Sequence, residues 1–497
     1  RLFTELVNFF DMATKNESSP LSGGKQTRRE FITTCSALTA GMFVFPTFIS
    51  SSFASPLTGA AASALNQLPR TKIRVVGAHP DPTRPNWPNI DYDFAGDIRQ
   101  FMNNLKSYCP HVDFSLVKVS EGSKEKAKEI LSRDREVDGY IVYLSGCLWG
   151  DLTETIGASG KPTVLVDHLY AGSGEFLTSY SRLKREGHKV IGISSSDFKD
   201  VVKGVECVDA VARLRNSTML VVGNDADQQV KSIYGTKVKT IPFSEINAAY
   251  EKINDEEAGN VADGWIYNAG KVMEPTRKEI IKSAKMYLTM KHLMEENNAQ
   301  AITVNCLGGI YNNRMVTAYP CMGFMQLDNE GLVGACEADQ RSTMTKMLMN
   351  YLIHQPGFIS DPVIDTSKHQ IIYAHCTGPT KMYGPEASSN PYHIRSHAED
   401  KKGASIRSLM PLDETITTIQ FDHNKKQVIF HQGRTVENVG VERACRTKLA
   451  AEVKGDMRKL MKYWDTWGWH CVTYYGDHKD QVYNIADLLG FEVIEEA

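Results

Sequence analysis

From Lys72 onward, the apolar positions follow two periodicities, one typical of strands and one typical of helices. Short β-branched runs are separated by longer segments whose apolar residues recur at helical spacing, a pattern typical of βαβ units around a parallel sheet. The expected strands are residues 72–79, 113–119, 138–146 and 161–168, and the expected helices are 95–108 and 124–134. The pattern predicts a first Rossmann-like α/β domain over residues 66–185.

The same alternation continues through a second stretch of the chain. Expected strands at 188–196, 218–224 and 237–243 flank a long helical segment at 198–217. We therefore predict a second Rossmann-like α/β domain over residues 186–300, and a C-terminal α+β domain over residues 301–497. The strand ends VVGAHPDP and TMLVVGNDAD lack the GxGxxG spacing that lets a backbone approach a pyrophosphate, so they read as ordinary βα turns rather than a dinucleotide site.

The first 65 residues have a different character. The segment KQTRREFI carries Arg28 and Arg29, and an apolar run and a stretch of small residues follow it. This order predicts an export signal of the twin-arginine type and a periplasmic or otherwise exported protein; the alternative is a disordered tail. The apolar run is short and contains Pro46, so we expect no stable membrane span. Cleavage after Ala54 and cleavage near Ala64 both fit, and residues 1–11 resemble read-through before Met12.

Composition narrows the class of partner. The chain has 497 residues, of which 42% are hydrophobic and 23% are charged, a net charge of −3 and a sequence pI near 6.6. No basic block is long enough to indicate a nucleic-acid surface, so small molecules are the expected partners. Nine cysteines follow the signal without any CxxC pair, which argues against a zinc ribbon and against a dense disulfide framework.

The C-terminal part carries the polar signals. In ACEADQRST, Glu337 and Asp339 end an apolar strand just before a helical run. If that segment is extended, both carboxylates point to one side, and Asp339 also occupies the position of a helix N-cap.

Further polar side chains lie downstream. His375 ends another strand-like run, and PYHIRSHAED places a stripe of polar residues on one face if it is extended, although a solvated strand edge explains the stripe equally well. Trp469 and His470 lie in an aromatic-rich segment near the end of the chain. The stripe consists of His393, Arg395, His397 and Glu399.

In combination, the phrases ACEAD, AHCTGPTKM, YHIRSHAEDKKG and WHCVTYYGDH resemble the L-fucose and L-arabinose isomerase superfamily, in an exported, uncharacterised branch, and the resemblance extends from about Lys72 to the end of the chain. It implies two α/β domains followed by a C-terminal domain of that superfamily's type, which carries the metal and sugar site. It also implies a homo-oligomer whose active sites borrow residues from a neighbouring subunit.

The resemblance further implies a divalent metal, usually Mn²⁺, held by two carboxylates and a histidine, and an aldose that becomes a ketose through an enediol. Glu337 or Asp339 matches the family's second metal acid, and His470 matches its late histidine. On this basis we expect Glu337 and Asp339 to be catalytic and, together with His470, to bind the metal. The expected sugar-binding residues are His375, Arg395, His397, Cys306 and Trp469.

One departure from the family pattern leaves three alternatives open. The first metal acid is expected about two dozen residues before Glu337, but residues 306–324 contain no Asp or Glu, and the nearest acid, Asp328, lies in a turn-like segment. Glu337 and Asp339 can both enter the metal shell. Alternatively, a ligand such as Cys306, Cys321 or His375 contributes and favours Zn²⁺. In the third alternative, the site binds sugar without isomerising it.

Two classes of function therefore follow from the sequence. The first is a metal-dependent carbohydrate isomerase that acts outside the cytoplasm. The second is an exported carbohydrate-binding protein that keeps the isomerase fold. The density of acids and histidines favours the enzyme, because a receptor needs aromatic side chains and hydrogen-bond donors but no such cluster.

Overall fold

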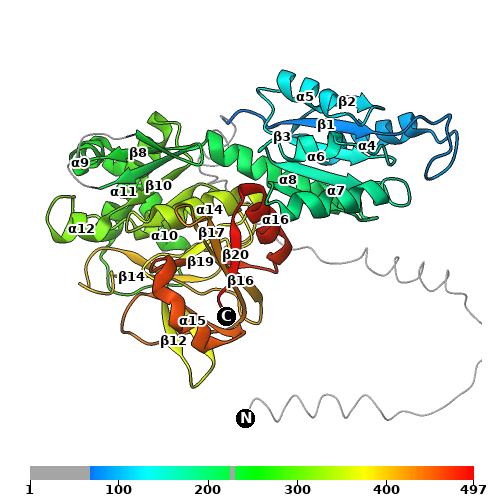
Figure 1. Ribbon diagram of the computed structural model, residues 1–497. Helices are drawn as coiled ribbons and strands as arrows, with labels where there is room; N and C mark the ends of the chain where they lie inside the picture. The colour runs from blue at the N-terminus through cyan, green and yellow to red at the C-terminus, as the bar shows by residue number, and fades with distance from the viewer. Residues whose placement is uncertain (1–67, 224–229) are drawn as a thin grey trace, which may run out of the picture. The chain divides into compact units, whose positions relative to one another are not determined.

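A computed structural model describes residues 68–223 and 230–497 (Figure 1). The export signal expected within residues 1–65 lies outside these residues. None of the helices in the described ranges has the length and apolar character needed to cross a lipid bilayer.

The first sheet has the strand order β2-β1-β3-β4-β5, and all of its strands are parallel. Its strands and helices match the expected periodicity closely; residues 190–193, from the stretch assigned to the second unit, form its last strand. The elements of this region are β1 (Lys72–Ala78), α4 (Phe94–Tyr108), β2 (Asp113–Val119), α5 (Lys124–Arg133), β3 (Gly139–Leu144), α6 (Leu152–Gly157), β4 (Thr163–Asp167), α7 (Ser173–Arg185), β5 (Val190–Ile193) and α8 (Phe198–Asn216).

The second sheet has the order β11-β10-β6-β8-β7 and is parallel except for the edge pair β7 and β8. It joins strands from both sides of residue 300. Its elements are β6 (Thr218–Val222), β7 (Val230–Ile233), β8 (Thr236–Ile241), α9 (Phe243–Lys252), α10 (Asp255–Asn268), α11 (Arg277–Glu296), β10 (Ala301–Val304), α12 (Cys306–Tyr311), α13 (Cys321–Asn329), β11 (Val333–Cys336) and α14 (Gln340–Ile353).

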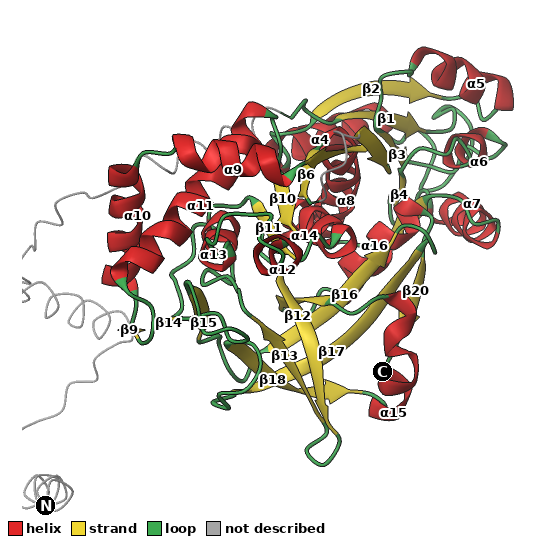
Figure 2. Ribbon diagram, turned by 90° about the vertical axis from the view of Figure 1, so that its left-hand side faces the viewer, coloured by secondary structure: helices red, strands yellow, loops and turns green. Residues whose placement is uncertain are grey.

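The third sheet is a closed barrel. Its strand order is β16-β19-β12-β13-β18-β17-β20, and β16 also pairs with β17, so the first six strands close on themselves (Figure 2). Closure leaves these strands without a free edge. The elements are β12 (Phe358–Asp365), β13 (Gln370–His375), β16 (Thr415–Asp422), β17 (Gln427–Asn438), β18 (Thr447–Lys454), α15 (Met457–Tyr463), a 3₁₀ turn (Trp464–Trp467), β19 (Cys471–Tyr475), α16 (Lys479–Leu489) and β20 (Glu492–Glu495).

A small fourth sheet and one helix complete the arrangement. β14 (Tyr392–Arg395) pairs with β9 (Lys271–Val272) and β15 (Ser405–Ser408). Helix α14 contacts β10 and β11 of the second sheet as well as β16 and β19 of the barrel, and α8 packs against α14 and the first sheet. The fold is of the predicted α/β class, with one fully parallel sheet and further mixed sheets. Helix α14 thus brings the ends of β11 and the barrel together.

Candidate metal centre

Glu337 and Asp339 lie in the short connection between β11 and α14. Glu337 and Ala338 have φ values of 61° and 53°, a left-handed turn that non-glycine residues rarely adopt. As the sequence predicts, Asp339 caps α14, and its Oδ1 accepts hydrogen bonds from the backbone nitrogens of Arg341 (3.0 Å) and Ser342 (3.1 Å). The turn and the cap together fix the position from which the Glu337 side chain leaves the backbone.

Three further side chains come from neighbouring barrel strands. In the antiparallel register of β12, Ser360 pairs with Cys471 of β19 and Asp361 pairs with Ala374 of β13. Asp361 therefore lies between His470, which immediately precedes β19, and His375, which ends β13. The nearest ligand atoms of Asp361, His375 and His470 all lie within 4.8 Å of one another.

His470 is the centre of this cluster. Its Nδ1 lies 3.0 Å from Asp339 Oδ2, and its Nε2 lies 3.2 Å from Asp361 Oδ1 and 3.5 Å from Glu337 Oε2. The Asp339 contact keeps a proton on Nδ1, so Nε2 is the ring nitrogen that faces the other two acids. Within the described part of the chain, Nε2 has no hydrogen-bond partner of good geometry. Three carboxylates therefore surround one imidazole.

The electrostatics of the cluster reflect this excess of negative charge. Burial alone would lower the pKa of His470, but hydrogen bonding to Asp339 and Asp361 outweighs it and raises the pKa to about 10. Burial raises the pKa of Glu337, and repulsion from Asp361, Glu399 and Asp339 adds to that effect. Burial also opposes ionisation of Asp339 and Asp361, yet hydrogen bonding from His470 lowers the pKa of both. The arrangement thus gathers three carboxylates around one imidazole.

His375 completes the inner wall of the cluster. Its Nδ1 accepts a hydrogen bond from the Cys376 backbone nitrogen at 2.9 Å, so a neutral ring carries its proton on Nε2. That Nε2 is buried and has no hydrogen-bond partner in the described ranges. Burial lowers the pKa of His375 to about 4, so the ring is neutral at physiological pH. His375 is thus placed to donate a hydrogen bond to a bound molecule.

Two other expected sugar-binding residues adjoin the cluster. The Trp469 side chain is 60% exposed next to His470, and it is a hydrogen-bond donor to Asp361 that contributes to the lowered pKa of that acid. Cys306 is buried at the start of α12, and its Sγ lies 3.4 Å from the Sγ of Cys336. The structure therefore brings Glu337, Asp339 and His470 together, with His375, Trp469 and Cys306 beside them.

The two remaining residues from the polar stripe have other partners. Arg395 is buried on β14 and donates hydrogen bonds to both carboxylate oxygens of Glu274, with a further one to Glu442. His397 stacks on Tyr319, and its Nδ1 lies 3.5 Å from the Tyr311 hydroxyl, which also donates to Glu399. The four residues of the stripe do not share one extended face, because β14 ends at Arg395, before His397 and Glu399.

The sequence predicts a further acid before Glu337, but the acid that joins the cluster, Asp361, follows Glu337 in the chain. Asp361 lies about two dozen residues after Glu337 and faces the same imidazole nitrogen. Asp328, the nearest acid on the expected side, forms a buried ion pair with Lys346 instead, with Oδ2 and Nζ 2.6 Å apart. The sequence signal for Asp361 was an acid directly before a proline inside an apolar strand, FISDPVI, which our sequence analysis did not use.

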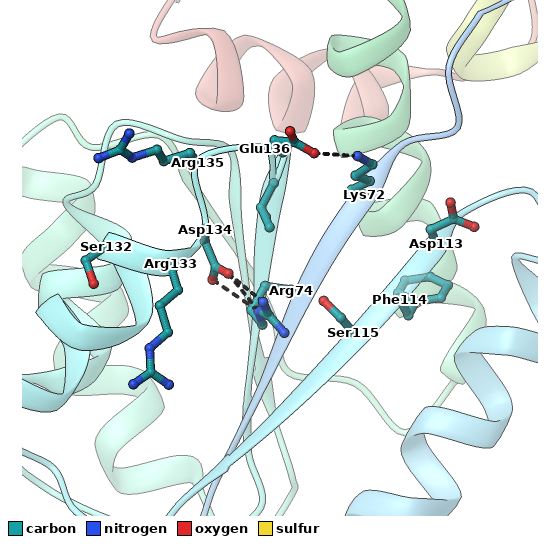
Figure 3. A pocket seen from close by; sticks show the side chains of 11 residues that line it. Lys72, Arg74, Asp113, Phe114, Ser115, Ser132, Arg133, Asp134, Arg135 and Glu136 are labelled. Carbon is teal, nitrogen blue, oxygen red and sulfur yellow. Dashed lines mark hydrogen bonds and ion pairs between the residues drawn. The ribbon is translucent and has the colours of Figure 1, made fainter.

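Two other polar features are less suited to a ligand. Besides the set of Cys336, Glu337 and His375, which adjoins the cluster, His111, Glu206 and Asp209 have metal-ligand spacing. Asp209, however, already accepts from Thr71 and from Arg213, 2.8 Å away. A surface hollow of about 530 Å³ at the amino ends of the first sheet contains four basic side chains (Figure 3). Three of these are paired with carboxylates: Arg74 with Asp134, Lys72 with Glu136 and Arg133 with Glu129. Neither feature has the unmatched charge found around His470.

Comparisons with known proteins agree with a sugar-related chemistry. No protein-family model matches the chain. The chain is 20% identical over 279 residues to a sulfoquinovose isomerase of Clostridium sp. (strain MSTE9), which covers 54% of this chain and 60% of that relative. The match thus spans less than two thirds of the relative's length.

Proposed function

We propose that the protein is a divalent-metal-dependent isomerase that interconverts an aldose and a ketose through an enediol. One observation carries the proposal: the Nε2 of His470 faces both Asp361 and Glu337, at 3.2 and 3.5 Å, while Asp339 holds the opposite ring nitrogen. A closed ion-pair network would place one cation against each acid. Here the described cation is a single imidazole, and it meets three acids.

The residues fit a hard or borderline divalent ion. Glu337 and Asp361 supply carboxylate oxygens, and His470 supplies an oriented imidazole nitrogen, a donor set that suits Mn²⁺. Cys336 has metal-ligand spacing to Glu337 and His375, but its sulfur contacts Cys306, and the set of Asp361, His375 and His470 contains no thiol; we therefore favour Mn²⁺ over Zn²⁺. When bound, such an ion would act as a Lewis acid that polarises the substrate carbonyl.

The chain's own side chains would then carry the protons. Glu337 has the raised pKa and a side chain that is 34% exposed, so it is the base that removes a proton from the carbon beside the carbonyl and returns it to the neighbouring carbon. The Nε2 proton of His375 would stabilise the oxygen on which negative charge develops. Asp339 is a positioning residue, because its two oxygens are occupied by the α14 N-terminus, Ser342 and His470.

The finer parts of the proposal rest on sequence. The quoted motifs support a fold of the fucose and arabinose isomerase type and a homo-oligomeric assembly, and the Arg28–Arg29 segment supports export by a twin-arginine route. The distant relative's name supports a sugar substrate. An exported sugar-binding protein with the same fold is the alternative, and it would bind sugar without changing it.

The deciding experiment combines metal analysis with a sugar panel. We expect protein purified without added metal to hold about one equivalent of a divalent ion, and to lose it in Glu337→Gln, Asp361→Asn and His470→Ala. Asp365→Asn, on the same strand as Asp361 but turned into a surface loop with Ser367, is the matched control. His375→Gln should keep the metal and lose turnover.

Activity is measured as interconversion of aldose and ketose on neutral sugars and on sulfoquinovose. No bound metal in the wild-type protein, or equal metal content in all variants, would refute the metal centre. Bound metal together with sugar binding but no interconversion would instead support the binding protein. Loss of metal in His375→Gln would make His375 a ligand rather than a hydrogen-bond donor.

A further inference from the structure

Cys306 and Cys336 form a close pair of free thiols next to the candidate metal centre. Both side chains are 3% exposed, and their sulfur atoms are 3.4 Å apart. Cys336 is the last residue of β11, and Cys306 opens α12 two residues after the end of β10. Because Val304 pairs with Cys336 in the parallel register, the two cysteines lie at neighbouring strand ends. They are not one isolated cysteine but a dithiol that the sheet aligns.

The same strand ends hold the turn that carries Glu337. Cys336 is bonded directly to Glu337, and the backbone nitrogen of Ala338 donates to the Val304 carbonyl at 3.1 Å. Glu337 and Ala338 both have left-handed φ values, which persist only where the surroundings hold them. Any change in the Cys306–Cys336 distance therefore acts on a turn with little freedom to absorb it.

From this geometry we infer that Cys306 and Cys336 are an oxidisable site that forms a disulfide when a small hydroperoxide reaches it. One thiol is oxidised by hydrogen peroxide to a sulfenic acid, with release of one water. The second thiol attacks that sulfur, the S–S bond forms, and the sulfenic oxygen leaves as a second water. In total, two thiols lose two hydrogens and two electrons to one peroxide, which is reduced to two waters. A reducing thiol reverses the bond by exchange.

The bond would move the metal acid. A disulfide holds its sulfur atoms at about 2.05 Å, so closing the present gap of 3.4 Å brings the two sulfur atoms more than an ångström closer, a shift shared between the side chains and the strand ends that carry them. Metal sites tolerate shifts of only about 0.2 Å in ligand distance. This consequence rests on the proposed function, since it takes Glu337 as a metal ligand. Oxidation would then weaken metal binding without touching His470 or Asp361.

The test treats the full-length protein with hydrogen peroxide and has two independent readouts. Peptide mapping without reduction should find a peptide linked through Cys306 and Cys336, which dithiothreitol abolishes. Titration with Mn²⁺ should show an affinity about tenfold lower after oxidation, the lower end of the loss seen when a ligand's support is disturbed, and full recovery on reduction. Each protein is compared with its own reduced state.

Two variants separate this site from other thiols. Cys336→Ser should abolish both the linked peptide and the peroxide effect on Mn²⁺ affinity. Cys445→Ser is the control, because Cys445 is a partly exposed thiol whose Sγ lies 3.7 Å from Asp361 Oδ2, and it should retain both effects.

The outcomes divide cleanly. Absence of the linked peptide in oxidised wild type, or loss of the effect in Cys445→Ser, overturns the assignment of Cys306 and Cys336. A linked peptide with unchanged Mn²⁺ affinity supports the oxidisable pair and overturns its control of Glu337. A linked peptide in a protein that binds no metal in either state supports the pair and refutes the proposed metal centre instead.

Discussion

Two groups of carboxylates lie beside the same helix, α14, one buried and one partly exposed, and they differ in how their charge is matched. Asp328 meets Lys346 of α14, and both side chains are 2% exposed. The pair is closed further by the Gly334 backbone, which donates to Asp328 and accepts from Lys346. At the N-terminus of α14, Glu337, Asp339 and Asp361 surround His470 alone.

The difference separates a structural acid from a functional one. A matched buried pair already satisfies its charges and hydrogen bonds, so it has nothing to offer a ligand. In the unmatched group, three carboxylates face one imidazole, and they raise the pKa of His470. The matching of charge therefore distinguishes the Asp328–Lys346 pair from the candidate metal centre.

The largest expected effect breaks the matched pair. Lys346→Met leaves Asp328 buried without a counter-charge and should lower the free energy of unfolding by about 3–5 kcal/mol, measured by urea denaturation. Adding Asp328→Asn should restore part of that loss, because the uncompensated charge is gone. If Lys346→Met alone were as stable as the wild type, the Lys346 charge would contribute nothing to the stability of the folded protein.

The next effect removes one acid from the unmatched group. Asp361→Asn should lower Mn²⁺ affinity at least about 100-fold, the upper end of the loss known for ligand-orienting groups, because a direct ligand is removed. Metal-free Asp361→Asn should lose only a little stability, because the lost attraction to His470 is partly offset by relief of the repulsion between Asp361 and Glu337. Isothermal titration and urea denaturation measure the two quantities, and a marked loss of metal-free stability would place Asp361 with the matched acids.

A smaller effect follows from the acid that orients His470. Asp339→Asn keeps a good helix cap but weakens the contact to the imidazole Nδ1, so Mn²⁺ affinity should fall about tenfold. The thermal stability of the metal-free protein should change little. An affinity equal to that of the wild type would mean that the Asp339 charge plays no part in positioning His470.

The smallest effect concerns a second matched group, Arg395 with Glu274. Hydrogen bonding from Arg395 lowers the pKa of Glu274 from 4.5 to about 2. A lowered carboxyl pKa gives stability that is present above pH 4.5 and is lost as the pH falls toward 2. Because the Glu274 side chain is 38% exposed, solvent screening should keep the loss below about 1 kcal/mol. Glu274→Gln should remove this part of the acid dependence, measured as unfolding free energy against pH.

The sequence predicted the parallel sheet well because its signals are local. A buried strand such as GYIVYL is a continuous apolar run, and helices such as α5 and α11 begin at Ser123 and Thr276 caps. The last strand of the first sheet was harder, because the sequence shows that residues 190–193 form a strand but not which sheet they join.

The site was only partly predictable for the same reason. Glu337, Asp339 and His470 stand out in short polar phrases, and the structure brings them together. Asp361 joins them through the pairing of β12 with β19, strands more than a hundred residues apart, and no local pattern encodes that register. Arg395 looked like a ligand residue in sequence, but Glu274, more than a hundred residues earlier, takes up its charge.

The ligands of the candidate centre come from two separate sheets, and this has a consequence for the folding of the chain. Glu337 extends from the second sheet, while Asp361 and His470 belong to the barrel. An ion held by all three would link the second sheet to the barrel, which already share contacts with α14. Its binding energy would then appear as cooperativity between the unfolding of the two sheets. Amide hydrogen exchange would then slow together at β11 and β19 when the ion binds.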